Sequence, residues 1–164
     1  MASAAVEMLA DQRSDIEKYP DLAMAVVVRN GLVLVQQRDR RSKCRVFEFP
    51  GGAIDFAETG EQAAIRELYE ETGIKRLPVL GIHTGTNEYG GTISYVVLSN
   101  NTDQKPVITQ SYREQKFYWL EPVDIPRDDF YPADIEFIDT SLPLYTRLCN
   151  PLPATDSVDG RDRS

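Results

Sequence analysis

Short apolar runs separated by turn residues dominate the first part of the chain. Residues 23–29 (AMAVVVR) and 32–37 (LVLVQQ) are rich in β-branched residues, and Asn30-Gly31 lies between them. That dipeptide favours a tight hairpin turn. Residues 46–52 (VFEFPGG) predict a short aromatic strand that ends at its proline. The pattern therefore predicts a β-hairpin followed by a third strand.

The second half of the chain repeats this alternation. Residues 78–100 (PVLGIHTGTNEYGGTISYVVLSN) predict two strands with a turn at Gly90-Gly91. Residues 116–122 (KFYWLEP) predict one more strand. We therefore expect several strands that are close enough in sequence to form one sheet.

Residues 60–72 predict the first main helix. Thr59 and Gln62 fit a capping box, in which each side chain binds the backbone N–H of the other residue. Gly73 lies where a glycine commonly ends a helix. The apolar strip expected to pack on the sheet consists of Ala64, Ile65 and Leu68.

Residues 132–142 predict a second helix, because Ile135, Ile138 and Leu142 follow helical spacing. Pro143 should end or kink it, and the helix can resume through residues 144–148. Strands mixed with two main helices indicate an α/β (α+β) sandwich.

The ends of the chain differ from its centre. Residues 1–19 are rich in Ala, Glu and Asp and predict an N-terminal arm or helix. Residues 20–150 predict a single domain, and 164 residues suit one core. Residues 151–164 are polar and predict a disordered C-terminal tail.

Composition and charge narrow the class of protein. The chain is 41% hydrophobic and 27% charged, with a formal charge of −8. A pI near 4.7 argues against binding a nucleic acid polymer. We expect no membrane segment and no secretory signal. Cys44 and Cys149 predict free thiols in a reducing cytoplasm. The composition leaves monomer and homodimer open.

Although the chain is acidic overall, five basic residues cluster within eight positions of the sequence. They are Arg38, Arg40, Arg41, Lys43 and Arg45. Two interpretations stay open: a solvated loop, or a landing site for an anionic substrate.

The predicted helix at residues 60–72 carries an acidic face. Glu67, Glu70 and Glu71 are related by i+3 and i+4, and Arg66 lies one turn from Glu70. Three carboxylates on one face repel, but they suit a hard divalent cation such as Mg²⁺, which prefers oxygen ligands. The alternative is a solvated acidic surface.

The residues around this face carry a resemblance to a known family. The constrained positions are Gly52, Glu58 and Arg66-Glu67-Leu68-Tyr69-Glu70-Glu71-Thr72-Gly73-Ile74. Their spacing resembles the complete Nudix box, G-x5-E-x7-R-E-apolar-x-E-E-x-G-apolar. The resemblance covers roughly residues 21–148 and implies the Nudix α/β/α sandwich, with a mixed β-sheet between helices.

The resemblance implies hydrolysis of a nucleoside diphosphate linked to another group, with Mg²⁺ or Mn²⁺ as cofactor. It assigns metal binding to Glu67, Glu70, Glu71 and the Gly52 carbonyl, and support of loop and helix to Glu58 and Arg66. Either Glu70 or Glu71 could orient or deprotonate the attacking water. Asp55 and Ala57 stand where many members have Glu and Gly.

Further matches resemble MutT-type triphosphatases. EFPGG at residues 48–52 is the segment by which those enzymes enter the box. Glu114 precedes Trp119 much as their outer catalytic or metal-binding Glu precedes a similar Trp, with Glu88 as the rival. Arg38 is the candidate phosphate-contacting arginine.

The segment DDFYPADIEFI, residues 128–138, is similar to the MutT segment that opens the final helix. Asp134 falls at the position of the amide that reads the base. An ionised carboxylate only accepts hydrogen bonds, so it would suit guanine N1–H and N2–H₂ or the cytosine amine. The alternative is a helix-end charge. Tyr131 is the candidate for stacking on a base.

We therefore predict a MutT-like Nudix hydrolase that cleaves a nucleoside triphosphate to a monophosphate and pyrophosphate. Its substrate could be an oxidised or non-standard nucleotide. The alternative enzymatic activity is that of a pyrophosphatase for ADP-ribose, a nucleotide sugar or a dinucleoside polyphosphate. A ligand-sensing domain without catalysis is disfavoured by the intact box, and a structural protein leaves the acidic face unexplained.

Overall fold

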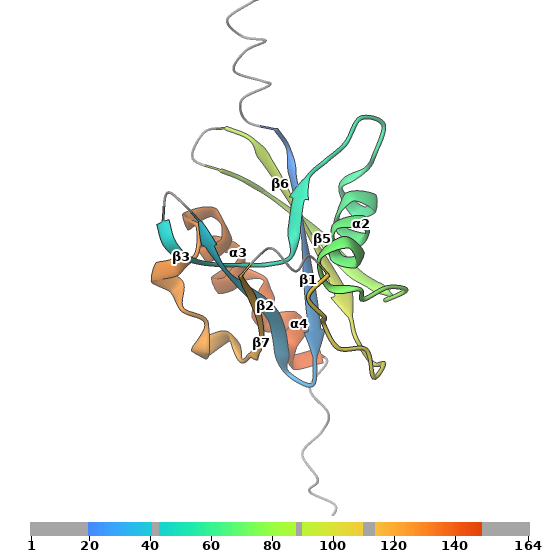
Figure 1. Cartoon of the computed structure of the whole chain (residues 1–164), viewed down its shortest axis with the longest axis vertical. Helices are drawn as coiled ribbons and strands as arrows, with labels where there is room; N and C mark the ends of the chain where they lie inside the picture. The colour runs from blue at the N-terminus through green and yellow to red at the C-terminus, as the bar shows by residue number, and fades with distance from the viewer. Residues whose placement is uncertain (1–19, 41–42, 88–89, 110–113, 149–164) are drawn as a thin grey trace, which may run out of the picture.

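The computed structural model describes residues 20–40, 43–87, 90–109 and 114–148 (Figure 1). The strands are β1 (Leu22–Arg29), β2 (Leu32–Arg40), β3 (Lys43–Glu48), β4 (Gly51–Ala53), β5 (Val79–Thr86), β6 (Thr92–Ser99) and β7 (Gln115–Leu120). The helices are α2 (Gly60–Thr72), α3 (Pro132–Thr140) and α4 (Leu142–Leu148), with 3-10 turns at Pro122–Asp124 and Arg127–Asp129.

The predicted hairpin is confirmed at its turn. Asn30 and Gly31 have φ of 51° and 81°, the left-handed values that the turn requires. Strand β1 also pairs in parallel with β6 and antiparallel with β4, while β2 pairs with both β3 and β7. The sheet is therefore mixed, as predicted.

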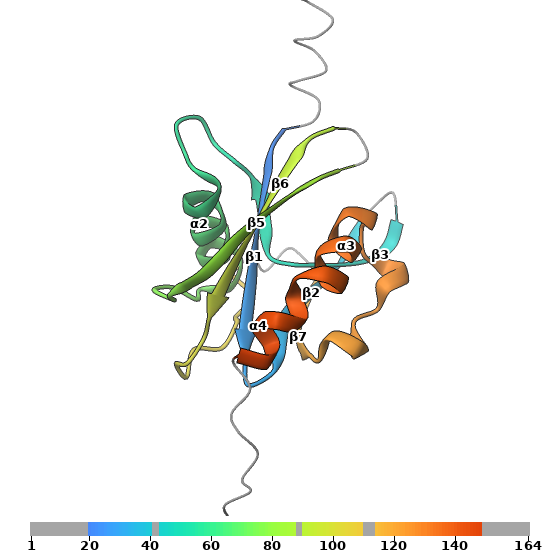
Figure 2. The ribbon, with the colours of Figure 1, turned by 180° about the vertical axis from the view of Figure 1, so that it is seen from behind.

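Helices cover both faces of this sheet. Figures 1 and 2 show α2 on one side, with α3 and α4 on the other. Apolar side chains on alternate positions of β1 feed two cores: Val26 and Val28 pack on the α3 side, and Ala25 and Val27 on the α2 side. The predicted α/β/α sandwich is confirmed.

Some boundaries differ from the sequence prediction. Residues 46–52 form parts of two strands, because β3 ends at Glu48 and β4 begins after Pro50, whose missing N–H cannot continue a ladder. The final helix breaks at Ser141, two residues before the proline at which the sequence predicted its end or kink. Pro143 lies in the first turn of α4, where its missing N–H leaves no helical bond unmade.

The apolar strip of α2 is also displaced by one residue. Ala63, Ala64 and Leu68 are buried, whereas Ile65 is 38% exposed. Successive helical residues are rotated by about 100°, so the face centred between Ala64 and Leu68 turns Ile65 away from the sheet. The prediction that Ile65 packs on the sheet was wrong.

Several predictions fall outside the described residues. They concern the arm at residues 1–19, the tail at residues 151–164, Arg41, Cys149 and the rival glutamate Glu88. In the part of the chain that the structure describes, no helix has the length and apolar character needed to cross a membrane.

Candidate active site

Both ends of α2 are fixed by local hydrogen bonds. The Thr59 N–H donates to Gln62 Oε1 over 2.9 Å, and the Gln62 N–H donates to Thr59 Oγ1 over 3.1 Å. Gly73 ends the helix at φ 78°, and its N–H donates to the Tyr69 carbonyl. The predicted capping box and glycine stop are therefore both confirmed, and they hold the acidic residues of the helix in register.

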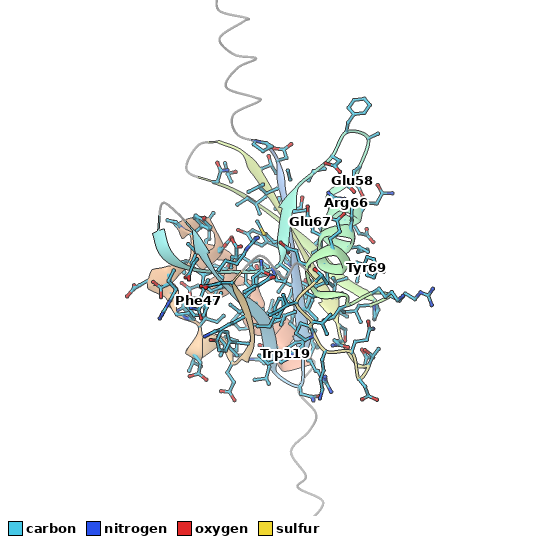
Figure 3. All side chains as sticks on the ribbon, in the orientation of Figure 1. Phe47, Glu58, Arg66, Glu67, Tyr69 and Trp119 are labelled. Carbon is cyan, nitrogen blue, oxygen red and sulfur yellow. The ribbon has the colours of Figure 1, made fainter. Side chains whose placement is uncertain are left out.

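Arg66 lies at the centre of the acidic face. Its Nε and Nη2 donate to the two carboxylate oxygens of Glu58 over 2.8 and 2.9 Å. Its Nη1 donates to Glu67 over 3.0 Å and to Glu70 over 3.2 Å. One guanidinium thus contacts three glutamates, and Figure 3 shows Glu58, Arg66 and Glu67 grouped between α2 and the loop that precedes it.

The loop between β4 and α2 is tied down by Glu58. The Asp55 N–H donates to Glu58 Oε1 over 3.0 Å, and Arg66 Nη2 donates to the Ala53 carbonyl over 3.1 Å. The hydrogen bonds from Arg66 and from the Asp55 backbone lower the pKa of Glu58 to about 2. Ala57 adopts φ 64°, a left-handed value that favours glycine. This backbone angle explains why many proteins with this motif have glycine at the position of Ala57.

Gly52 approaches Glu67 more closely than a larger residue could. A Cβ added at Gly52 would lie 2.5 Å from Glu67 Oε1, well inside van der Waals contact. The backbone of β4 and the Glu67 carboxylate are therefore adjacent. The carbonyl of the next residue, Ala53, accepts from Arg66 on the same helix.

Glu71 points into the protein, unlike its neighbour Glu70. Glu71 is 6% exposed, and its Oε2 accepts the Gly51 N–H over 2.8 Å. Burial raises the pKa of Glu71 to about 7, against the lowering effects of Arg38 and the Gly51 N–H. The Arg38 Nη2 lies 3.3 Å from Glu71 Oε1, so the predicted phosphate-binding arginine is adjacent to this carboxylate.

A buried polar network that we did not predict supports Arg38. Glu48 Oε1 accepts from Arg38 Nε over 2.5 Å and from Gln36 Nε2 over 3.3 Å. Gln36 Oε1 in turn accepts from Gln115 Nε2 over 2.6 Å. The only sequence signal was the placement of Gln36 and Arg38 at alternate positions of one strand, which puts both side chains on the same face. The network joins β2, β3 and β7 to the acidic helix.

The donor chemistry of this site fits a divalent cation. Carboxylate and carbonyl oxygens are the ligands that Mg²⁺ prefers. Across the described ranges, no group of three acidic, His or Cys side chains already converges on one point for a metal. The physical reason is that Arg66 and Arg38 draw the carboxylates to themselves. One guanidinium shared by three glutamates still leaves net negative charge for a cation to offset.

Glu114 lies at the edge of this site. It is exposed and directly precedes β7, whose first residue, Gln115, is paired in register with Arg38. The fold thus brings Glu114 to the strand end that carries Arg38. Within the described part of the chain, the Glu114 side chain forms no hydrogen bond or ion pair with the glutamates of α2.

Asp134 lies on the other side of the sheet, in the first turn of α3. It is 2% exposed, and its Oδ1 accepts from the Tyr95 hydroxyl over 2.7 Å. Burial raises the pKa of Asp134 to about 6, while the Tyr95 hydrogen bond lowers it. The Tyr95 ring is stacked on Phe137 with centroids 4.4 Å apart. Tyr131 is half-buried at the start of α3.

These features define a class of protein: an α/β/α sandwich with a carboxylate-rich helix suited to a hydrated divalent cation and an anionic ligand. Residues 19–140 match the NUDIX domain. The chain belongs to the Nudix family. It is a hydrolase of phosphorus-containing acid anhydrides.

Curated relatives have related activities in their names. The CTP pyrophosphohydrolase of Escherichia coli is 27% identical over 128 residues, which cover 77% of this chain and 94% of that protein. The 8-oxo-dGTP diphosphatase of Haemophilus influenzae is 31% identical, over 70% of this chain and 85% of its own. The RNA pyrophosphohydrolase of Tolumonas auensis is 40% identical over only 42% of this chain and 37% of its own.

Solved structures share the fold. MutT of Aliivibrio salmonicida and Vibrio cholerae, described together, gives a TM-score of 0.57 at 20% identity, over 74% of this chain and 96% of the other. The E. coli ORF135 protein gives a TM-score of 0.58 at 22% identity, over 84% and 98%. At these identities the likeness concerns the fold alone.

Proposed function

We propose that this protein is a Mg²⁺-dependent nucleoside triphosphate pyrophosphohydrolase that releases a nucleoside monophosphate and pyrophosphate. The observation that carries the proposal is the acidic face of α2, where Arg66 joins Glu58, Glu67 and Glu70 beside the close approach of Gly52. The names of the CTP and 8-oxo-dGTP relatives support the triphosphate class.

The residues that would hold the cation are Glu67, Glu70, Glu71 and the carbonyl of Gly52. Mn²⁺ would suit the same oxygen donors. When bound, the cation supplies Lewis-acid neutralisation of the phosphate oxygens and a more acidic water. Glu58 and Arg66 hold the loop and the helix in position. Glu70, half-exposed at the surface, or Glu71 takes the proton from the attacking water.

Arg38 would bind the substrate phosphates. Its guanidinium bridges Glu48 and Glu71 across the site, which keeps a positive charge beside the helix carboxylates. A substrate phosphate competes for the guanidinium with these carboxylates, so part of its binding energy offsets the lost ion pairs. Glu114, at the end of the adjacent strand, is the outer carboxylate of this proposal.

Base selection is assigned to Asp134, with Tyr131 stacking on the base. The Tyr95 hydroxyl donates to Oδ1 of Asp134, and the carboxylate keeps further acceptor sites on both oxygens. These sites suit the amino group of cytosine or the N1–H and N2–H₂ of guanine. Tyr95 was not identified from the sequence as a site residue.

The proposed substrate is a small nucleotide, and the protein is proposed to act in the cytoplasm as a monomer or homodimer. Neither a nucleic acid polymer nor a membrane is part of the proposed activity. The acidic pI of about 4.7 supports the first of these statements, because polymer binding needs a basic face.

A hydrolysis screen tests the proposal. The substrates are the canonical nucleoside triphosphates, 8-oxo-dGTP, ADP-ribose, a nucleotide sugar and a dinucleoside polyphosphate, each with Mg²⁺, with Mn²⁺ or with EDTA. We expect metal-dependent release of pyrophosphate, at highest kcat/KM from a triphosphate. Preferred cleavage of ADP-ribose or a nucleotide sugar would reject the triphosphate assignment.

Two variants test the helix carboxylates. We expect Glu70→Gln and Glu71→Gln each to lower kcat by at least about 100-fold, the scale on which removal of one catalytic group acts. Circular dichroism should show that both variants remain folded. If both retain wild-type turnover, the proposed metal site is wrong.

A further inference from the structure

Strand β5 forms one edge of the sheet. Within the described residues, β5 pairs with β6 and with no other strand. The pairing is regular from Gly81 to Thr86, because the register shifts only between Val79 and Gly81. In an antiparallel ladder every second residue directs its N–H and C=O groups away from its partner, so this segment presents a free row of hydrogen-bonding groups. The row is about 20 Å long.

Charged residues mark two other edge strands of the sheet but not this one. Strands β3 and β7 carry the exposed cations Arg45 and Lys116. Strand β5, VLGIHTGT, has no Asp, Glu, Lys, Arg or Pro. Charges and prolines on an edge strand discourage pairing with another chain. Their absence from β5 favours an edge that accepts a partner strand.

Exposed apolar side chains lie on β5 and on the helix beside it. Leu80 and Ile82 belong to β5, while Ile65 and Tyr69 lie one helical turn apart on α2, where Figure 3 labels Tyr69. Each of these four side chains is between 38% and 52% exposed. We call them the β5 strip. Apolar residues that are exposed together, rather than singly, indicate an interaction surface.

The flank of α2 that carries Ile65 and Tyr69 faces β5. Glu67 lies against Gly52 of β4 on one flank of the helix. Ile65 and Tyr69 are each two residues from Glu67, about 160° around the helix axis, and so occupy the opposite flank. The first residues of β1 pair with β4 on one side and with β6 on the other. The flank opposite Glu67 therefore faces β6 and, beyond it, β5.

Ile82 points to the same face of the sheet as α2. The residues on either side of it point to the other face, which α3 and α4 cover (Figure 2). A Cβ added at Gly81 would meet the Tyr145 hydroxyl, and His83 Nε2 lies 2.6 Å from the same hydroxyl. Because side chains alternate along a strand, Ile82 turns toward α2. Leu80 is the extra residue at the register shift and is exposed beside it.

The two ends of β5 lie beside opposite charges. The exposed cations Lys75 and Arg76 shortly precede its first residue. At the other end, Thr86 pairs with Thr92, whose N–H donates to the Asp21 carboxylate over 3.1 Å. If two copies of the strand run antiparallel, the basic end of one copy lies beside the acidic end of the other. This arrangement is electrostatically complementary.

We propose that β5 is the interface of a homodimer, in which the β5 strands of two copies pair antiparallel about a twofold axis. One sheet then continues through both copies, and the two β5 strips pack together on the α2 side. A twofold interface needs a surface that is complementary to itself. An uncharged free edge, an apolar strip beside it and opposite charges at its ends meet this requirement.

The expected dimer is weak and leaves the proposed catalytic site open. One strand edge and four side chains from each copy make a small interface, about 1,000 Å² in total, which predicts a Kd in the micromolar range. Glu67 lies on the opposite flank of α2, beside Gly52, so pairing at β5 does not cover it. The proposal is independent of the reaction that the protein catalyses.

Sedimentation equilibrium of the full chain tests the dimer at concentrations from about 1 μM to 200 μM. We expect the mass to rise from 18.5 kDa toward twice that value. Ile82→Lys places a charge within the strip and should raise the Kd at least tenfold. Val123→Lys is the matched control, because Val123 is 79% exposed in the turn that contacts α4. A monomer at every concentration, or equal weakening by both variants, would overturn the proposal.

Hydrogen exchange shows whether the strand edge itself is paired. The amides of residues 81–86 should exchange more slowly above the Kd than below it, and Ile82→Lys should abolish this difference. A dimer without such protection has its interface elsewhere, which would reject the β5 pairing. Protection in a monomer that is lost when residues 1–19 are deleted would show that the chain covers its own edge, and would also reject the dimer.

Discussion

Substitution of Gly52 by alanine should separate catalysis from stability. The added Cβ would lie 2.5 Å from Glu67 Oε1, and ordinary van der Waals contact begins at 3.4 Å. The carboxylate must therefore move by about 0.9 Å, the difference between these two distances. Because it is the end of a flexible side chain, the carboxylate can move while the β4 backbone stays in place.

The expected loss follows from this displacement. Catalytic groups must be held within about 0.5 Å of the productive geometry, and an error of 1 Å can reduce the rate 100-fold. We expect kcat/KM of Gly52→Ala to fall about 100-fold, which corresponds to about 2.7 kcal/mol of transition-state stabilisation. The free energy of unfolding should change by less than about 1 kcal/mol, since alanine also restricts the unfolded chain.

The assay combines pyrophosphate release under kcat/KM conditions with urea unfolding of the same samples. Gly60→Ala is the matched control, because its Cβ would lie 2.5 Å from Ser94 Oγ and would displace no carboxylate. We expect the control to lose some stability and to retain kcat/KM within about threefold. If Gly52→Ala retained wild-type kcat/KM, the close approach to Glu67 would not position a metal ligand.

Three further variants test local interactions. Thr59→Ala should lower the free energy of unfolding by about 1 kcal/mol in urea titrations, because the helix loses its cap. Glu58 has its pKa lowered to about 2 by Arg66, so its contribution to stability is present above pH 4.5 and is lost as the pH falls through 2. Glu58→Gln should therefore flatten the decrease of Tm over that range; an unchanged Tm profile would argue against the ion pair. Burial raises the pKa of Asp134 from 3.8 to about 6, so wild-type stability decreases as the pH rises through 6. Asp134→Asn should remove that decrease, worth at most about 3 kcal/mol at pH 8 and little at pH 4, and should change the ratio of kcat/KM for CTP and dGTP. Equal effects at both pH values would contradict the burial argument.

Most local features of the fold could be predicted from the sequence. The turn at Asn30-Gly31 and the boundaries of α2 depend on hydrogen bonds and backbone angles within a few residues. Such features are encoded by neighbours in the chain. The spacing from Gly52 to Ile74 predicted the family for the same reason, because one turn and one helix position those side chains.

The orientation of each carboxylate could not be predicted in this way. The helical spacing placed Glu67, Glu70 and Glu71 on one face, but Glu71 turns inward because the Gly51 N–H and Arg38 reach it from other strands. The displaced strip at Ile65 has a similar origin, because the direction in which a helix faces depends on how it packs.

The sequence by itself determined the hairpin, the helix ends and the family to which the chain belongs. Only the tertiary structure decided that β7 pairs with β2, which connects Gln115 to the Arg38 network. The pairing of Tyr95 with Asp134, 39 residues apart, was decided in the same way. Contacts of this kind depend on the pairing of distant strands, and that pairing is selected by the burial of the whole sheet between its two helical layers.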